Sequence, residues 1–230
     1  MIDFHSHFLP AVDDGSQSLA QTEEMLKCAF SQGVRQIVAT PHFYGDEMVP
    51  ADFLENRQRA FDQIPWDAAA MPRIHLGAEV AYFGNMSRSE AVQQLQIDNT
   101  GLLLVEMPFS PWTDRIVQDV CRLQERQGLI PVLAHVERYR QKSQFPRYRD
   151  MLLDAGVLFQ SNAGAFLKLG TRSWVLRQMK DGCVHFLGSD CHNMTTRAPN
   201  LGEAAKVIEK KLGQPALEEI TAFSAQALGL

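Results

Sequence analysis

Cysteine, long apolar runs and excess positive charge are all scarce in this 230-residue chain. No C-x-x-C pair occurs, which argues against a disulfide framework and for reduced thiols in the cytoplasm. No run reaches the roughly 18 apolar residues of a membrane span, and the N-terminus shows no signal-type segment. The net charge of −5 gives no electrostatic footprint for nucleic acid. We therefore expect a cytoplasmic protein without membrane insertion or a nucleic-acid partner.

The chain has enough apolar material for one large folded unit. Hydrophobic residues make up 45% of it and charged residues 21%, as in ordinary globular proteins. No internal repeat, low-complexity tract or Pro/Gly/Ser-rich linker divides it. We expect a single domain spanning residues 1–230.

Strand-like apolar runs alternate with helical segments along the sequence. The expected strands cover residues 2–5, 36–39, 73–76, 102–105, 130–134, 157–160 and 184–188. The expected helices cover about 19–32, 51–63, 113–127, 147–155, 171–180, 201–212 and 215–228. This alternation implies parallel pairing with right-handed crossovers. The fold class is therefore α/β, and seven such units fit a closed (β/α)7 TIM-like barrel better than an open sheet.

Side chains of the metal-ligand type stand at the ends of these strands. His5 and His7 close the first strand, and Asp190 and His192 repeat that spacing after the last. Side chains two apart on an extended segment point the same way, so each pair can share one ion. Strands two to five are followed by His42, Glu79, Glu106 and His135. Because a parallel barrel gathers such residues at its carboxyl-terminal face, the pattern predicts a metal cluster there.

The donor set limits the kind of metal. Imidazole and carboxylate without thiolate suit Mn²⁺, Fe²⁺, Zn²⁺ or Co²⁺, and the sequence alone does not choose among them. With Asp14 there are nine candidates, more than the three or four protein ligands of one catalytic ion. Two or three ions would use them all. His75 and His185 lie within strands, and we expect them to pack or hydrogen-bond instead.

Four motifs occur in order along the chain. They are Met1-Ile2-Asp3-Phe4-His5-Ser6-His7, Val12-Asp13-Asp14-Gly15, Ala134-His135-Val136-Glu137-Arg138-Tyr139 and Ser189-Asp190-Cys191-His192-Asn193. Together they resemble the polymerase-and-histidinol-phosphatase (PHP) superfamily and, within it, the bacterial capsule-type protein tyrosine phosphatases. The resemblance covers essentially the whole chain and implies a distorted seven-stranded barrel with a trinuclear metal site.

The resemblance also implies how the ligands divide. The first metal would be held by His5, His7, Glu79 and Asp190. The second would share Glu79 as a bridge with Glu106 and His135. The third would be held by Asp14, His42 and His192. Mn²⁺ is the first choice of ion, with Fe, Zn, Co and Mg as alternatives. Asp13 is the rival of Asp14, and we expect it to cap the turn at Gly15 or to make a supporting hydrogen bond.

Two arginines are the candidate phosphate-binding residues. Arg138 follows His135 by three residues and Arg197 follows His192 by five. Guanidinium groups make bidentate contacts with phosphate that ammonium groups cannot copy, and each of these arginines matches one in the resembled family. The alternative is that both are surface arginines on long loops.

The segment that begins at Cys191 also fits C-x5-R, the loop of the cysteine-dependent tyrosine phosphatases. Its five intervening residues contain no glycine, and Ala198-Pro199 follows Arg197 instead of Ser or Thr. Alternation also turns Cys191 away from the side that Asp190 and His192 share. We expect Cys191 to be a buried filler.

The leading hypothesis is a metal-dependent tyrosine phosphatase that hydrolyses phosphotyrosine with a metal-activated hydroxide. The resemblance names a substrate, a bacterial tyrosine autokinase that controls capsular or exopolysaccharide synthesis. The alternatives are a small-molecule phosphatase such as histidinol phosphatase, and a non-catalytic metal-binding accessory domain. Aromatics in the segments 43–50 and 109–112 could stack on a substrate ring or pack on the barrel rim. The segment 162–166 is expected to carry no chemistry and only to line the mouth of the barrel.

Overall fold

The computed structural model describes residues 1–230 and contains nine β-strands, all paired in parallel. They are β1 (Ile2–Ser6), β2 (Gln36–Ala39), β3 (His42–Tyr44), β4 (Arg73–Leu76), β5 (Glu79–Ala81), β6 (Leu102–Glu106), β7 (Ile130–Leu133), β8 (Leu158–Asn162) and β9 (Phe186–Gly188). The first group runs β1-β2-β4 and the second runs β3-β5-β6-β7-β8-β9. Every strand therefore runs the same way, with its carboxyl end at one face.

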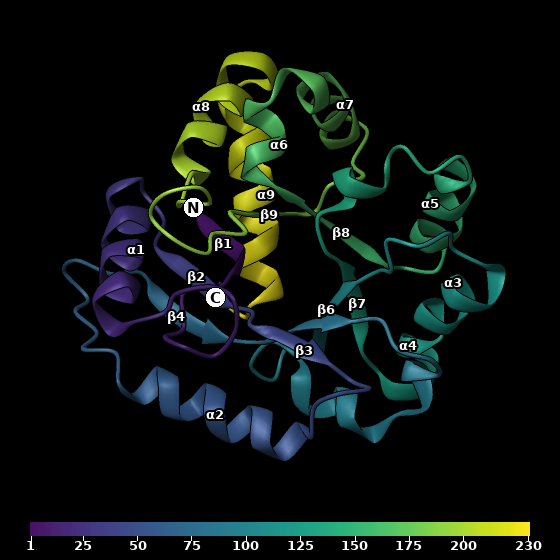
Figure 1. Ribbon diagram of the computed structural model, residues 1–230. Coiled ribbons are helices and arrows are strands. Elements are labelled where there is room, and N and C mark those ends of the chain that lie inside the picture. Colours follow the sequence, from purple (N-terminus) through teal and green to yellow (C-terminus); the bar gives the residue numbers. More distant parts are fainter.

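The two groups join into one ring (Figure 1). Only two residues separate β2 from β3, and only two separate β4 from β5, so each pair is one strand position with a break. The breaks contain Pro41 and Gly77, residues that weaken regular strand pairing. At the seam, the Asp190 N–H donates to the His5 carbonyl at 2.8 Å and the His7 N–H donates to the Cys191 carbonyl at 2.9 Å. The nine strands fill seven positions, which confirms the predicted seven-stranded barrel.

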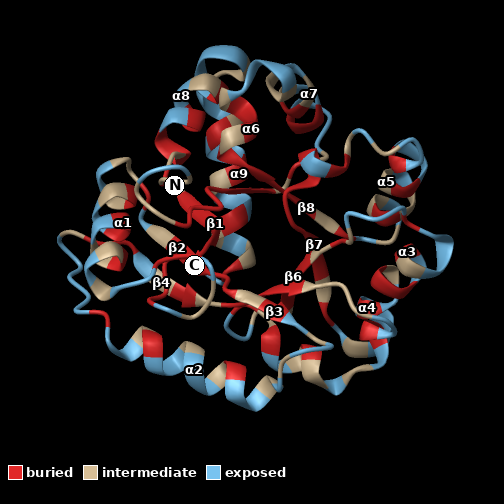
Figure 2. Ribbon diagram, in the orientation of Figure 1, coloured by how far each residue is buried: buried red, intermediate tan, exposed pale blue.

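Helices surround the ring and hide its outer face (Figures 1 and 2). The α-helices are α1 (Leu19–Ser31), α2 (Pro50–Asp62), α3 (Asp114–Cys121), α4 (Leu123–Gln127), α5 (Phe145–Asp154), α6 (Ala163–Leu167), α7 (Leu169–Lys180), α8 (Leu201–Leu212) and α9 (Gln214–Ala227). Three 3-10 helices are η1 (Met86–Arg88), η2 (Glu90–Leu95) and η3 (Val136–Tyr139). None of the helices is long and apolar enough to cross a lipid bilayer.

Local signals explain most of the helix boundaries. The Ser18 hydroxyl caps α1 by accepting from the Gln21 N–H, because the first N–H groups of a helix have no internal partner. The helix expected to run to about residue 127 is instead interrupted at Arg122, which separates α3 from α4. The short helix α6 falls in the segment 162–166, for which no helix was expected.

Three apolar clusters hold the barrel and its helices together. One joins β1 and β9 to β6 and β7 across the ring, with the Phe4 and Phe186 rings stacked at 3.9 Å between centroids. The other two lie between strands and helices, one under α1, α7 and α8 and the other under α3 and α5. The buried strands and half-exposed helices follow this layering (Figure 2). The barrel interior is therefore filled, and a site can form only at its mouth.

Candidate metal centre and phosphate pocket

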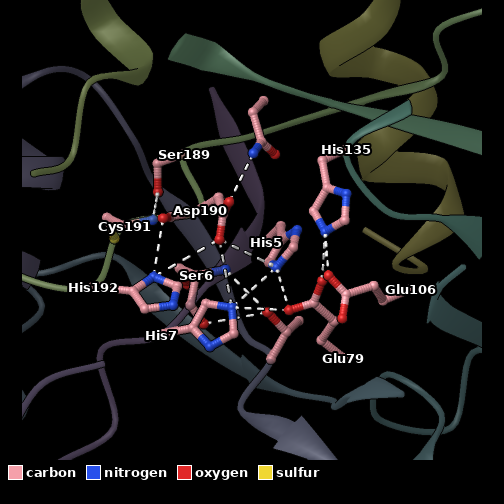
Figure 3. A network of polar contacts seen from close by, with 12 residues as sticks. His5, Ser6, His7, Glu79, Glu106, His135, Ser189, Asp190, Cys191 and His192 are labelled. Atoms are coloured by element: carbon pink, nitrogen blue, oxygen red, sulfur yellow. Dashed lines mark hydrogen bonds and ion pairs between the residues drawn. The ribbon is translucent and has the colours of Figure 1, made fainter. Parts of the chain in front are cut away.

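The structure brings all nine candidate ligands together at the carboxyl ends of the strands. Glu79, the first residue of β5, lies at their centre (Figure 3). Its Oε2 lies 3.1 Å from His5 Nε2, 3.2 Å from His7 Nε2 and 3.1 Å from His42 Nδ1. Its Oε1 lies 2.9 Å from His135 Nε2. One carboxylate therefore faces two separate groups of imidazoles, which is the arrangement of a bridging ligand.

Each pair of residues spaced two apart points its side chains to the same place, as the sequence predicted. His5 Nε2 and His7 Nε2 lie 3.0 Å apart, and Asp190 Oδ1 lies 3.6 Å from each of them. His192 Nδ1 lies 3.7 Å from the same carboxylate oxygen. Asp190 thus joins the first and last strands of the ring in one cluster.

The remaining candidates complete two further groups. Glu106 Oε1 lies 3.1 Å from His135 Nε2, beside Glu79 (Figure 3). Asp14 Oδ1 lies 3.4 Å from His42 Nε2 and 3.3 Å from His192 Nε2. His7 and His42 also lie close enough to serve neighbouring groups, so the borders between groups are less sharp than the resemblance implies.

Asp13 has the supporting position that the sequence suggested. Its Oδ2 accepts from His7 Nδ1 at 2.7 Å and from the His42 N–H at 3.0 Å, while its Oδ1 accepts from the Gly15 N–H at 2.9 Å. The bond to Nδ1 orients the His7 ring so that its Nε2 faces Glu79. Asp14, by contrast, is 66% exposed and turns its oxygen to the imidazoles.

Two of the candidate ligands, His135 and Asp190, have strained backbone conformations. His135 has φ 35° and Asp190 has φ 53°, both in the left-handed region that residues with a Cβ seldom adopt. Such strain persists only where surrounding contacts impose it, and it concentrates at functional sites. Gly15 and Gly188 permit the close packing around them, since a Cβ at Gly188 would lie 2.5 Å from His5 Cβ.

The electrostatics of the cluster suit a cation. Burial alone would raise the pKa of Glu79, but the charge of His5 and hydrogen bonds from His135 and His42 hold it well below its usual range. Burial, helped by the charges of His7 and Arg197, lowers the pKa of His192 to about 4, so its imidazole is neutral. Its Nε2 is buried without a hydrogen-bond partner. Ionised carboxylates and free imidazole nitrogens are the donors that Mn²⁺, Fe²⁺ or Zn²⁺ take.

Strand β8 carries two amide side chains, Gln160 and Asn162, that contact candidate ligands and were not predicted from the sequence. The Gln160 Oε1 accepts from the His135 N–H at 2.7 Å and lies 3.1 Å from His5 Nδ1. Its Nε2 donates to Asn162 Oδ1 at 2.9 Å, and Asn162 Nδ2 donates to Asp190 Oδ2 at 2.7 Å. The two amides thus orient the candidate ligands around them. Segment 162–166 is expected only to line the mouth of the barrel, and Asn162 in addition bonds to a candidate ligand. The signal for it was the same two-residue spacing at a strand end.

A cavity of about 500 Å³ opens beside this cluster. Arg138, Arg197, Asn162 and Asp190 line it. Arg197 Nη2 lies 2.6 Å from Asp190 Oδ1, and Arg138 Nη2 contacts Asp190 Oδ2. The two arginines that sequence spacing singled out therefore reach the same carboxylate, Arg138 from η3 and Arg197 from the loop after β9.

Cys191 faces away from both the cavity and the metal cluster. It is 1% exposed and packs in the apolar cluster under α1 and α8. Burial raises the pKa of its thiol far above the ordinary value. The predicted orientation is confirmed, and the C-x5-R match does not form a phosphate loop.

Each of the two aromatic segments places one ring near the mouth and one in the core. Tyr44 stacks on His42 with centroids 5.6 Å apart, and Phe109 is 59% exposed with its ring 6.3 Å from that of His135. Phe43 and Trp112 are buried. Tyr44 and Phe109 are therefore placed to meet a substrate ring, while Phe43 and Trp112 pack in the core.

The two histidines expected to have structural roles do have them. His75 bonds to Asp98 at 2.7 Å and lies 2.9 Å from Gln36 Oε1. His185 accepts from the Phe159 N–H at 3.0 Å. Neither belongs to a candidate metal group.

Residues 1–228 match the family described as capsular polysaccharide synthesis, CpsB/CapC. This chain belongs to that family. The tyrosine-protein phosphatase YwqE of Bacillus subtilis is 32% identical over 231 residues, 93% of this chain and 85% of YwqE. The tyrosine-protein phosphatase CpsB of Streptococcus agalactiae serotype III is 28% identical, over 99% of this chain and 98% of CpsB. The resemblance read from the four motifs is thereby confirmed.

Solved structures agree on the fold. One from a study of YwqE from Bacillus subtilis and CpsB from Streptococcus pneumoniae, described as unique metal-dependent tyrosine phosphatases, matches with a TM-score of 0.81 at 30% identity. The match covers 98% of this chain and 93% of that one. A phosphotriesterase homology protein from Escherichia coli matches with a TM-score of 0.53 at 12% identity, over 94% of each chain. The second likeness shows the barrel fold alone.

Proposed function

We propose that this protein is a metal-dependent protein tyrosine phosphatase. The observation that carries the proposal is Glu79, whose two oxygens face separate imidazole groups beside a cavity lined by two arginines. The relatives named above are tyrosine-protein phosphatases, which supports the proposed activity.

We assign the ligands in three groups that share Glu79 and its neighbours. The first group is His5, His7, Glu79 and Asp190; the second is Glu79, Glu106 and His135; the third is Asp14, His42 and His192. We propose two to three divalent ions, with Mn²⁺ as the first choice. Within these groups the distances between donor atoms run from 2.9 Å, between Glu79 and His135, to 3.6 Å, between Asp190 and His5 or His7.

The chemistry divides between the ions and the chain. Bound divalent ions would supply hydroxide near neutral pH and neutralise phosphate oxygens. Arg138 and Arg197, which line the cavity, would hold the phosphate through charge-assisted hydrogen bonds. Phe109, exposed and close to His135, would pack against the phenyl ring of the substrate.

Membership of a capsular polysaccharide synthesis family supports a proposal about the physiological setting. We propose that the substrate is a phosphorylated bacterial tyrosine autokinase of capsular or exopolysaccharide synthesis. The proposal places the protein in the cytoplasm as a single barrel domain.

The test compares phosphotyrosine peptide with histidinol phosphate as substrates, before chelation, after it, and after Mn²⁺ is restored. We expect peptide turnover that chelation abolishes and Mn²⁺ restores, and we expect His135→Ala to abolish it. His75→Gln is the matched control, because His75 hydrogen-bonds outside the cluster. Turnover that survives thorough chelation but is lost on thiol alkylation would refute the metal mechanism, and a preference for histidinol phosphate would refute the substrate class.

A further inference from the structure

The cavity beside the metal cluster extends beyond the group that would hold one phosphate. Besides Arg138 and Arg197, its wall contains Arg140, Lys168 and Thr171. Arg140 directly follows η3, while Lys168 and Thr171 stand at the start of α7. Its volume of about 500 Å³ falls within the range that encloses drug-sized ligands, far more than a phosphoryl group needs.

The cations next to the metal cluster pair with a carboxylate, whereas those near the start of α7 do not. Arg138 and Arg197 both pair with Asp190. Arg140 and Lys168 have no carboxylate within 4.0 Å, so their charges are uncompensated. In a chain of net charge −5, two unpaired cations on one cavity wall create a local field that attracts anions.

Arg140 is also held in place. Its Nη2 donates to the Gly170 carbonyl at 3.1 Å, which ties the guanidinium to the start of α7 beside Lys168. A guanidinium has five N–H donors, so this bond leaves the others available. Part of the ordering cost of binding is therefore already met in the folded protein.

The rest of the lining indicates what kind of group would bind. Only three of the sixteen lining residues are hydrophobic, namely Phe109, Ala165 and Ala198. An apolar ligand group would find little to contact around Arg140 and Lys168. A charged group would find donors and two positive charges.

We propose that Arg140 and Lys168 form a second anion subsite, which binds a carboxylate or phosphate carried by the substrate near its phosphotyrosine. This inference rests on the proposed function, because it extends the same cavity. It makes the enzyme selective for phosphotyrosines with an acidic or phosphorylated neighbour.

The experiment measures kcat/KM for three phosphotyrosine peptides and for p-nitrophenyl phosphate. The peptides carry neutral flanking residues, acidic flanking residues or a second phosphotyrosine. The test variant is Arg140→Gln/Lys168→Gln. The control is Arg177→Gln/Lys210→Gln, which removes the same charge from exposed positions on α7 and α8 that do not line the cavity.

We expect wild-type protein to prefer both anionic peptides over the neutral one by roughly tenfold, the effect of one good charged contact. The test variant should lose that preference to within about twofold while its p-nitrophenyl phosphate turnover stays unchanged. The control should retain the preference. A response to only one of the two anionic peptides would identify whether carboxylate or phosphate is the bound group.

Three results would overturn the subsite. Wild-type protein could hydrolyse all three peptides at equal rates, or the test variant could lose as much activity on p-nitrophenyl phosphate as on the anionic peptides. The control variant could also lose the preference for anionic peptides to the same degree as the test variant. Failure of the proposed function gives a different pattern, in which wild-type protein hydrolyses p-nitrophenyl phosphate but no phosphotyrosine peptide. In that case the acidic peptide is tested as an inhibitor of p-nitrophenyl phosphate hydrolysis. Inhibition that the Arg140→Gln/Lys168→Gln variant loses supports the subsite, and inhibition that the variant retains refutes it.

Discussion

Replacing Gln160 by leucine removes a buried side chain that bonds to three neighbours without touching substrate. The side chain is fully buried, and it satisfies the His135 N–H, His5 Nδ1 and Asn162 Oδ1. Leucine has a similar size but offers neither an acceptor nor a donor. All three groups then remain buried without a partner.

The expected loss can be worked out from these contacts. Each of the three orphaned buried polar groups costs about 1–3 kcal/mol, so Gln160→Leu should lower the free energy of unfolding by about 3–9 kcal/mol. That is a large part of the 5–15 kcal/mol typical of a folded domain. Since the same bonds fix the His5 tautomer and the His135 backbone, metal affinity should fall by about 10–100-fold.

Urea unfolding of the metal-free protein measures the first effect, and metal titration measures the second. Gln160→Glu is the conservative variant, because a carboxylate oxygen can still accept from His5 and His135. It should keep metal affinity closer to wild type than Gln160→Leu does. Gln178→Leu is the control, since Gln178 is a buried glutamine on α7 whose partner is Arg149.

The reasoning would fail if Gln160→Leu bound metal as tightly as wild type while remaining folded. It would also fail if Gln178→Leu lost metal to the same degree, because the effect would then reflect general destabilisation.

Three further outcomes are expected. Arg138→Ala or Arg197→Ala should each lower kcat/KM by about 10–100-fold, the worth of a hydrogen bond to a charged group, without loss of bound metal by mass spectrometry; metal loss would contradict the assigned roles. Cys191→Ala should lower the free energy of unfolding in urea by about 1–2 kcal/mol, because it leaves a small cavity in the core. Turnover should be retained, and an inactive folded variant would support the thiol mechanism. Burial lowers the pKa of His185 below its ordinary 6.5, so the unfolded chain binds more protons there, and unfolding free energy should fall as pH drops below about 6.5. His185→Gln should show a flatter dependence in urea titrations between pH 5 and 8, and an unchanged slope would refute this source.

The barrel is predictable from the sequence because residues of the metal-ligand type coincide with strand ends. His5, His7 and Asp190 stand at the ends of apolar runs that read clearly as strands. The second halves of two strands, β3 and β5, were not predicted as strands. Each is only three residues long, too short for a period-two pattern to be recognised.

The roles of Gln160 and Asn162 are not predictable from the sequence, because their residue types carry no signal. Both side chains hold candidate ligands in place, but amides are not strong metal ligands. Their role depends on β8 lying between β7 and β9, which places them next to His135 and Asp190. Such cross-strand neighbours become visible only when the ring is closed.

Arg138 and Arg197 both form ion pairs with Asp190, so a bound cation and the two guanidinium groups must share this carboxylate. A cation that binds Asp190 competes with the guanidinium groups for the carboxylate oxygens. A phosphate that binds the guanidinium groups frees those oxygens for a cation. The two equilibria are therefore linked: whatever factor phosphate adds to cation affinity, the cation must add to phosphate affinity. Product phosphate and metal should accordingly leave this site with difficulty when both are present, and more easily when either is scarce.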